Sequence, residues 1–182
     1  MPVTRRLDKY WVDHNFSYLV HRLGLVPLFE PSGFFYEDLA APGDATGPGT
    51  VFARAAGAIF RHAGVPEVPV SFTPGMAGAG EFQFIPHPGQ PGGMVPSCIR
   101  ISDRYRTIRD PRLRGMAAGA ILAHEIAHYC LMEKGILRET TDNERLTDLG
   151  LMVLGLGKLY FNGGTWLSGN TGRTSATWSR ST

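Results

Sequence analysis

Hydrophobic residues recur every three to four positions in four stretches of the chain, and this spacing buries one face of a helix. The four predicted helices cover residues 8–25, 51–63, 111–134 and 143–159. Between the second and third helices the pattern changes to short apolar runs bounded by proline or glycine, which are typical of strands. The predicted strands cover residues 68–72, 81–85 and 98–101. This order predicts an α+β fold, with a small, mostly antiparallel sheet of three or four strands packed on the helices.

The helix of residues 111–134 has clear signals at both ends. Asp110 and Pro111 suit its N-cap and its first position, and Gly135 suits the position just past its C-terminal end. This helix is rich in alanine, and the next helix is rich in glycine. The small residues are Ala117, Ala118, Gly119, Ala120, Ala123 and Ala127 on the first helix and Gly150, Gly155 and Gly157 on the second. They predict a close approach of the two helix backbones.

The chain has 182 residues, of which 43% are hydrophobic, and this length suits one domain better than two. We expect a single domain over residues 1–162, followed by an irregular tail over 163–182. Within the domain, residues 1–50 form an N-terminal helix and a loop rich in Pro and Gly. Residues 51–110 form a helix and the small sheet, and residues 111–162 form the last two helices.

The net charge is only +2, and the densest group of basic residues is interrupted by Asp103 and Asp110. This arginine group consists of Arg100, Arg104, Arg106, Arg109, Arg112 and Arg114. A solvated connection between strand and helix explains it better than a phosphate-binding patch, because no array of aromatic residues for base stacking accompanies it. We therefore expect no nucleic-acid partner.

The chain contains two cysteines, Cys98 and Cys130, so no disulfide framework is indicated. Charged residues near the N-terminus stand where a signal peptide needs an unbroken apolar stretch, and the longest apolar runs are too short to span a bilayer. These features predict a cytoplasmic protein without a membrane partner.

Residues 124–128 read His-Glu-Ile-Ala-His and lie inside an apolar predicted helix. Two histidines four positions apart share one face of a helix, so the side chains of His124 and His128 can reach one metal ion. Glu125 points about 100° around the helix from His124 and is better placed beside a metal-bound water than as a ligand. This pattern predicts a hydrolytic zinc site. Cys130 lies on another face of the helix and is expected to be a buried packing thiol.

A third ligand is expected at the start of the next helix, where Glu144 and Asp148 are again four positions apart. Two carboxylates on one face repel each other, and a cation bound between them removes the repulsion. One carboxylate would bind the metal while the other accepts the free ring N–H of a ligand histidine and fixes its tautomer. The alternative is a capping box, in which Thr141 and Glu144 only close the start of the helix.

The two motifs together, His-Glu-x-x-His followed by Asn-Glu-x-x-Thr-Asp, resemble those of the gluzincin metallopeptidases, the group typified by thermolysin. The resemblance extends over residues 97–162 and points particularly to the small single-domain members called minigluzincins. It implies a zincin-like fold and a bound Zn²⁺. The site residues that it implies are His124, His128 and Glu144 as zinc ligands, Glu125 as general base, and Asp148 as the carboxylate that holds a ligand histidine.

The resemblance also implies a function, a zinc-dependent endopeptidase that hydrolyses a peptide or protein substrate with a zinc-activated water. It further implies that the strand within residues 97–103 lies at the sheet edge and binds an extended substrate; the alternative is an internal strand with no free edge. Two departures from the family pattern stand out. Only sixteen positions separate His128 from Glu144, and no histidine follows His128 to steady the oxyanion. Three tyrosines are candidates for that role, with packing as the alternative for each. They are Tyr105, Tyr129 and Tyr160.

Two other functions stay open. The missing oxyanion histidine leaves room for a catalytically inactive zinc-binding domain that acts through protein–protein contacts, and the arginine group leaves a weaker case for nucleic-acid binding. The aromatic-rich segment of residues 1–50 either covers the core or lies in the cleft and holds the enzyme latent. The sequence indicates neither the substrate nor the oligomeric state.

Overall fold

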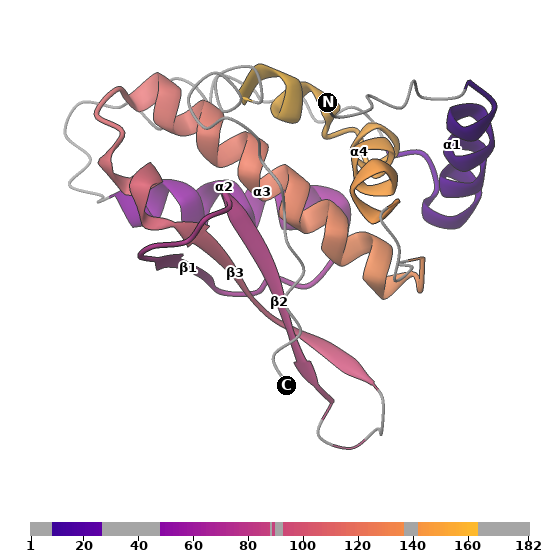
Figure 1. The fold of residues 1–182 in the computed structure, drawn as a ribbon, viewed down its shortest axis with the longest axis horizontal. Helices are drawn as coiled ribbons and strands as arrows, with labels where there is room; N and C mark the ends of the chain where they lie inside the picture. The colour runs from indigo at the N-terminus through magenta and orange to yellow at the C-terminus, as the bar shows by residue number, and fades with distance from the viewer. Residues whose placement is uncertain (1–8, 27–47, 88, 90–92, 137–141, 164–182) are drawn as a thin grey trace, which may run out of the picture.

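The computed structural model describes residues 9–26, 48–87, 89, 93–136 and 142–163 (Figure 1). Its helices are α1 (Lys9–Leu23), α2 (Pro48–Ala63), α3 (Pro111–Glu133) and α4 (Asn143–Val153), with the short 3-10 helix η3 (Asp103–Thr107) before α3. Its strands are β1 (Val70–Thr73), β2 (Gly80–Pro86) and β3 (Met94–Ser102). A further helix covers residues 157–163. The expected α+β class is confirmed. Most of the loop expected before α2, and the tail beyond residue 163, lie outside the described residues.

The three strands form a mixed sheet in the order β1-β3-β2. β3 pairs in parallel with β1, where Val70 faces Ile99, and antiparallel with β2, where Phe82 faces Ile99. The expectation of a mostly antiparallel sheet is therefore wrong. The reason is the connection of residues 74–79, which carries the chain past one strand position and leaves a gap of about 10 Å that β3 then fills.

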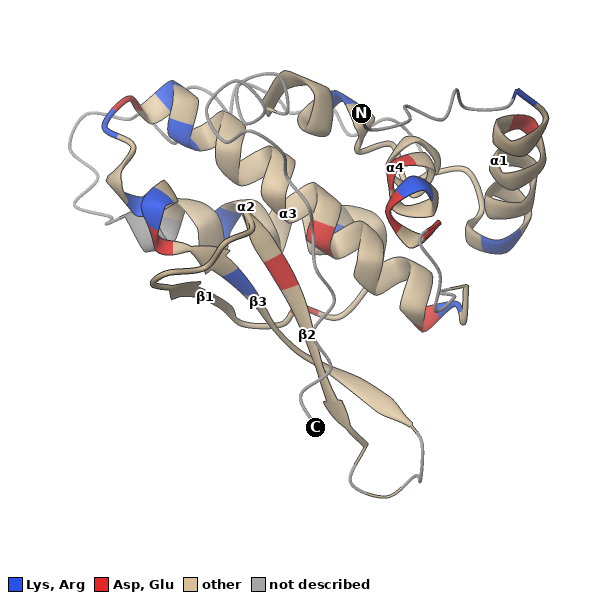
Figure 2. Cartoon of the chain, in the orientation of Figure 1, with Lys and Arg blue, Asp and Glu red and all other residues tan. Residues whose placement is uncertain are grey.

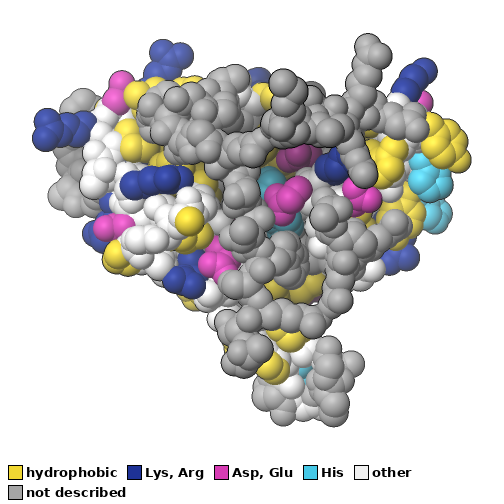
Figure 3. Space-filling model, viewed as in Figure 1, with side chains coloured by type: hydrophobic (Ala, Val, Ile, Leu, Met, Phe, Trp, Pro, Cys, Tyr) yellow, Lys and Arg dark blue, Asp and Glu magenta, His cyan; other side chains and the backbone are white. Residues whose placement is uncertain are grey.

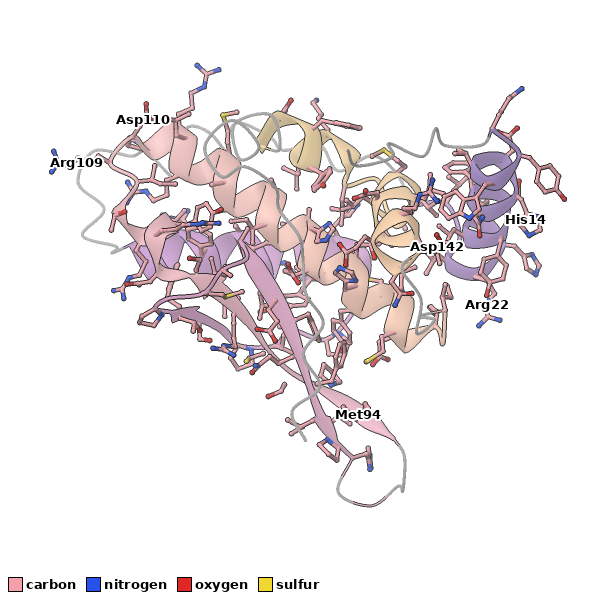
Figure 4. All side chains as sticks on the ribbon, in the orientation of Figure 1. His14, Arg22, Met94, Arg109, Asp110 and Asp142 are labelled. Atoms are coloured by element: carbon pink, nitrogen blue, oxygen red, sulfur yellow. The ribbon has the colours of Figure 1, made fainter. Side chains whose placement is uncertain are left out.

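β3 is longer than expected, because it begins at Met94 and runs through Pro96. Pro96 lies opposite Phe84, where the pairing with β2 shifts register. A proline has no N–H to donate, so it is tolerated in a strand at such an irregularity. The β2–β3 hairpin extends well beyond the helices, and Met94 lies near its far end (Figure 4).

The central position of β3 corrects the expectation about the sheet edge. The segment of residues 97–103 was expected to offer a free edge for substrate, but most of it belongs to β3, which has a partner strand on each side. The alternative of an internal strand is correct. Among the strands that the structure describes, none pairs with the outer edge of β2, so β2 supplies the free edge nearest α3.

One face of the sheet packs against α2 and α3. Phe72 of β1 contacts Phe52 of α2 with ring centroids 5.2 Å apart, and Phe82 of β2 stacks on Tyr129 of α3 at 5.0 Å. The opposite face is polar, with an Arg100–Glu81 ion pair at 3.6 Å. This alternation along each strand places α3, with its predicted ligands, directly against β2.

The ends of α3 agree with the sequence signals. The side chain of Asp110 accepts hydrogen bonds from the N–H groups of Arg112 and Leu113, and Gly135 follows the helix with φ +63°. A left-handed φ of this kind favours glycine, so the helix ends where the sequence predicts. The Cys130 side chain is buried in the core, as expected. Burial also raises the pKa of its thiol to about 12.

The helix predicted over residues 143–159 is broken in two. α4 ends at Val153, and Gly155 adopts φ +70° before the 157–163 helix begins. Gly150 packs on α3 as expected, since a Cβ there would contact Leu131 at 3.5 Å. Gly155 and Gly157 do not serve this approach, because Gly155 makes the turn and a Cβ at Gly157 would overlap the side chain of Met152 in α4.

α1 braces α4 from the side opposite the sheet (Figure 1). Leu19 of α1 is completely buried in a small apolar cluster with Leu131 of α3 and Leu146 of α4. The Arg145 guanidinium of α4 also lies over the Trp11 ring, 4.8 Å from its centroid. These contacts fix the helix that carries Glu144.

The arginine group gathers around η3 and the start of α3 (Figure 2). Arg100 and Arg106 pair with Glu81 and Asp103, and Tyr105, which is buried, accepts a hydrogen bond from Arg104. Tyr105 and Tyr129 are both buried in the core, which agrees with the packing alternative for each. None of the helices that the structure describes is long and apolar enough to cross a membrane.

We expect Leu19→Ala to lower the free energy of unfolding by about 2 to 5 kcal/mol, because it removes a fully buried side chain from the contact between α1 and α4. Tyr10→Ala, on the same helix at a position that is 75% exposed, is the control and should change stability by under about 0.5 kcal/mol. Urea denaturation of both variants measures the difference. Equal small effects would contradict the packing of α1 on α4.

Candidate metal centre

Three predicted ligands meet where the first turn of α4 lies against the middle of α3. Nε2 of His124 lies 3.1 Å from Nε2 of His128 and 3.2 Å from Oε2 of Glu144. Oε1 of Glu144 lies 3.5 Å from Nε2 of His128. One donor atom from each residue falls within 4.8 Å of the others, so the group could hold one metal ion. Histidine and acidic side chains lie together near the centre of the face shown in Figure 3.

The spacing of these atoms fits a metal ion. Nitrogen and oxygen donors about 2.0–2.1 Å from a tetrahedral ion such as zinc lie roughly 3.3 Å from one another. The two histidine Nε2 atoms, 3.1 Å apart, are close to that value, and Glu144 offers a different oxygen to each, Oε2 at 3.2 Å from His124 and Oε1 at 3.5 Å from His128. The site is therefore arranged for binding without a large movement of either helix.

Thr147 fixes the tautomer of His128. Its hydroxyl donates to the carbonyl oxygen of Asn143 at 2.8 Å, and the same oxygen lies 3.0 Å from Nδ1 of His128. Because the single hydroxyl proton is used on Asn143, Nδ1 of His128 must be the donor to Thr147. Nε2 of His128 then carries a free lone pair, which is the form that binds a metal.

The lone pairs at the centre of the site suit a cation. Burial and the neighbouring charge of His124 lower the pKa of His128 to about 3, so this imidazole is neutral. Its Nε2 faces Oε1 of Glu144, and this buried oxygen has no hydrogen-bond partner. Two acceptors 3.5 Å apart without a proton between them repel each other, and a metal ion between them turns the repulsion into attraction.

His124 is surrounded by carboxylates. Burial alone would lower its pKa, but the hydrogen bond to Glu144 and the surrounding carboxylate charges outweigh burial, so the pKa of His124 is raised. Nδ1 of His124 is buried without a hydrogen-bond partner and lies 3.8 Å from Oδ1 of Asp148. Asp148 is therefore the carboxylate nearest this ring nitrogen. Glu144 lies on the opposite side of the ring, at Nε2, so the structure separates the positions of the two carboxylates.

The start of α4 bears on the capping-box alternative. Asp142 is the N-cap of α4, and it lies at this end of the helix in Figure 4. Asp142 itself has helical dihedral angles (φ −85°, ψ −7°) and its side chain makes no cap hydrogen bond, so the capping-box alternative stays open. Thr141, the other half of that box, lies outside the described residues. The described contacts of the Glu144 carboxylate are with the two histidines.

Glu125 is buried between α3 and β2, and its side chain is only 3% exposed. Its carboxylate accepts a hydrogen bond from the backbone N–H of Phe82. Gly80 permits this approach, because a Cβ there would lie 2.7 Å from Oε1 of Glu125 and 2.8 Å from Cγ2 of Ile121. Burial raises the pKa of Glu125 to about 7, and the charge of Glu144 adds to this effect.

No family model, no curated protein and no solved structure matches this chain. The assignment of the site therefore rests on the geometry of its residues. That geometry brings together His124, His128 and Glu144, with Glu125 and Asp148 beside them.

The sequence pattern did not single out two residues that shape this site. Thr147 lies inside the second motif, and its hydroxyl in a helix interior could have indicated a partner across the helix pair. Gly80 stands at the start of a short apolar run and carries no local signal of its role. Only the packing of β2 on α3 shows that a side chain there would displace Glu125.

We expect about one divalent metal ion per chain, and we expect Glu144→Gln to weaken metal affinity by more than about 100-fold, because it removes a charged ligand. Asp142→Asn is the control, since it removes one negative charge from the same helix end without contacting the histidines. Metal analysis and competition with a chromophoric chelator measure both. An unchanged affinity in Glu144→Gln would leave Glu144 a purely structural residue.

A second prediction concerns Gly80. Gly80→Ala should leave metal content unchanged but lower any hydrolytic activity at least about 10-fold, because the new methyl group overlaps the Glu125 carboxylate. Gly57→Ala is the matched control, since a Cβ there meets only the ends of Arg61 and Glu67 at 3.4 Å. Loss of metal in Gly80→Ala would show instead that the substitution displaces α3 itself.

Proposed function

We propose that the chain is a zinc-dependent endopeptidase with a zincin-like fold, as the resemblance to gluzincins implies. The observation that carries this proposal is the convergence of His124, His128 and Glu144 on one point. Two neutral imidazoles and one carboxylate form the donor set typical of catalytic zinc sites, which keep one further position open for chemistry. A purely structural zinc site would normally have four protein ligands. Among the residues that the structure describes, the group contains three.

A bound zinc ion supplies Lewis acidity, which activates water and polarises the carbonyl of the scissile bond. Glu125 moves the proton in this proposal. One of its carboxylate oxygens accepts a proton from the attacking water and later returns it to the leaving amine. The hydrogen bond from Phe82 and the close approach of Gly80 hold this carboxylate in one place. A fixed base avoids the loss of rate that comes from a mobile one.

The free edge of β2 supports a peptide as substrate. The carbonyl oxygen of Ala79 accepts a hydrogen bond from the N–H of Ser102 in β3, and backbone groups alternate in direction along a strand. The N–H and C=O groups of Gly80 and Phe82 therefore face the opposite side, where no described strand pairs. The Phe82 N–H donates to Glu125, so the Gly80 N–H and the C=O groups of Gly80 and Phe82 are the groups left for a peptide. Main-chain hydrogen bonds at such an edge bind an extended peptide with little dependence on its sequence.

We expect Glu125→Gln to retain zinc while peptide hydrolysis falls by about 100-fold or more, because the amide keeps the size of the side chain but cannot take up the proton. The assay is cleavage of a peptide library with blocked termini, with and without chelator. Glu133→Gln, an exposed glutamate at the end of the same helix, is the control and should retain full activity.

Two outcomes would overturn the proposal in different ways. A wild-type protein that holds zinc and cleaves no peptide would favour the catalytically inactive zinc-binding domain. Cleavage that resists the chelator and survives Glu125→Gln would place the activity at another site.

A further inference from the structure

Tyr160 touches two members of the metal centre at once. Its ring stacks on the imidazole of His124, with centroids 5.6 Å apart and planes 20° apart. Its hydroxyl forms a hydrogen bond with the Asp148 carboxylate. Asp148 in turn lies 3.8 Å from Nδ1 of His124. These three side chains come from three different helices, namely α3, α4 and the 157–163 helix.

The 157–163 helix is held against α3 by a close contact. A Cβ at Gly163 would overlap the carbonyl oxygen of Met116 and would lie 2.5 Å from Cβ of Ala120. Only glycine permits this approach. Met116 lies eight positions before His124 on the same helix, so the contact fixes Tyr160 relative to His124.

The Asp148 carboxylate needs a hydrogen-bond partner that holds it in place. Its side chain is 51% exposed, and its distance from Nδ1 of His124 is longer than a hydrogen bond. A carboxylate so exposed is free to turn toward water. The phenol hydroxyl of Tyr160 binds it from the protein side and limits this rotation, which keeps an oxygen available for the N–H of His124.

We propose that Tyr160 is a positioning residue that holds His124 ready to bind the metal, through its ring directly and through Asp148. This inference rests on the proposed metal site but not on peptide hydrolysis. Tyr160 was one of three candidates for a donor to the oxyanion. Its hydroxyl has one proton, and that proton is used on Asp148, so its contacts favour the positioning role.

The test uses Tyr160→Phe, which keeps the stacked ring and removes the hydroxyl, together with Asp148→Asn and the double variant. Tyr105→Phe is the matched control, because it removes a buried, hydrogen-bonded hydroxyl far from the metal centre. Zinc affinity is measured by chelator competition, and the visible spectrum of the Co²⁺-substituted protein reports the geometry around the ion. Neither measurement requires catalysis.

We expect Tyr160→Phe to weaken zinc affinity about 10-fold and to change the Co²⁺ spectrum, as the loss of a partner behind a metal ligand does. On the Asp148→Asn background the same substitution should have little further effect, since the hydroxyl acts through that carboxylate. Tyr105→Phe should leave affinity and spectrum unchanged even if it lowers stability. Tyr160→Leu, which also loses the ring, should weaken binding more than Tyr160→Phe.

Two results would overturn this inference while leaving the proposed function standing. One is an unchanged affinity and spectrum in Tyr160→Phe. The other is an unchanged affinity with a large fall in kcat alone, which would make Tyr160 a catalytic residue. Conversely, a wild type that binds zinc and cleaves no peptide would remove the peptidase proposal, and the affinity measurements on Tyr160 would still decide its role.

Discussion

The crowding of two imidazole nitrogens and one carboxylate is the constraint on which this structure depends. Nε2 of His124, Nε2 of His128 and the Glu144 carboxylate are brought within about a hydrogen-bond length of one another, although one proton at most can be shared among them. The hydrogen bond between His124 and Glu144 relieves part of this crowding, and a cation bound among the three groups would relieve the rest. The close packing of α4 on α3 at Gly150 and the tautomer fixed by Thr147 both maintain the crowding. A group held in this way could bind one metal ion.

The surrounding fold holds α3, α4 and β2 in fixed positions around the three candidate ligands. α3 lies against β2 through the stacked rings of Phe82 and Tyr129, and α4 is braced by α1 through Leu19. Each contact restrains a different part of the site. The sheet fixes Glu125, the brace fixes Glu144, and the 157–163 helix fixes His124 through Tyr160. With the backbones fixed in this way, small changes in side-chain position are enough to bring the polar groups of the site together.

Short sequence patterns correctly predicted the features that depend on neighbouring residues, such as helix ends and side chains that share one helix face. The caps at Asp110 and Gly135 gave the limits of α3, and the spacing of His124 and His128 gave their shared face. Strand order could not be read in this way, because the insertion of β3 between β1 and β2 depends on pairing between distant segments. Gly150, Gly155 and Gly157 also look alike in sequence, but their roles differ. Gly150 packs against Leu131 of α3, Gly155 makes a turn with positive φ, and Gly157 lies against Met152. The Gly80–Glu125 contact escapes sequence reasoning for the same reason, since it joins two residues that lie 45 positions apart in the chain.

The order of the strands has a kinetic consequence. Pairing of β2 with β3 closes a loop of a few residues, whereas pairing of β1 with β3 joins Val70 to Ile99, which are 29 positions apart in the chain. Local contacts form early in folding because they lose little chain entropy, so the β2–β3 hairpin can form before β1 is added. His124 and Glu144 are also only 20 positions apart. The hairpin and the pair of helices α3 and α4 can thus form while β1 and α2 are still unattached.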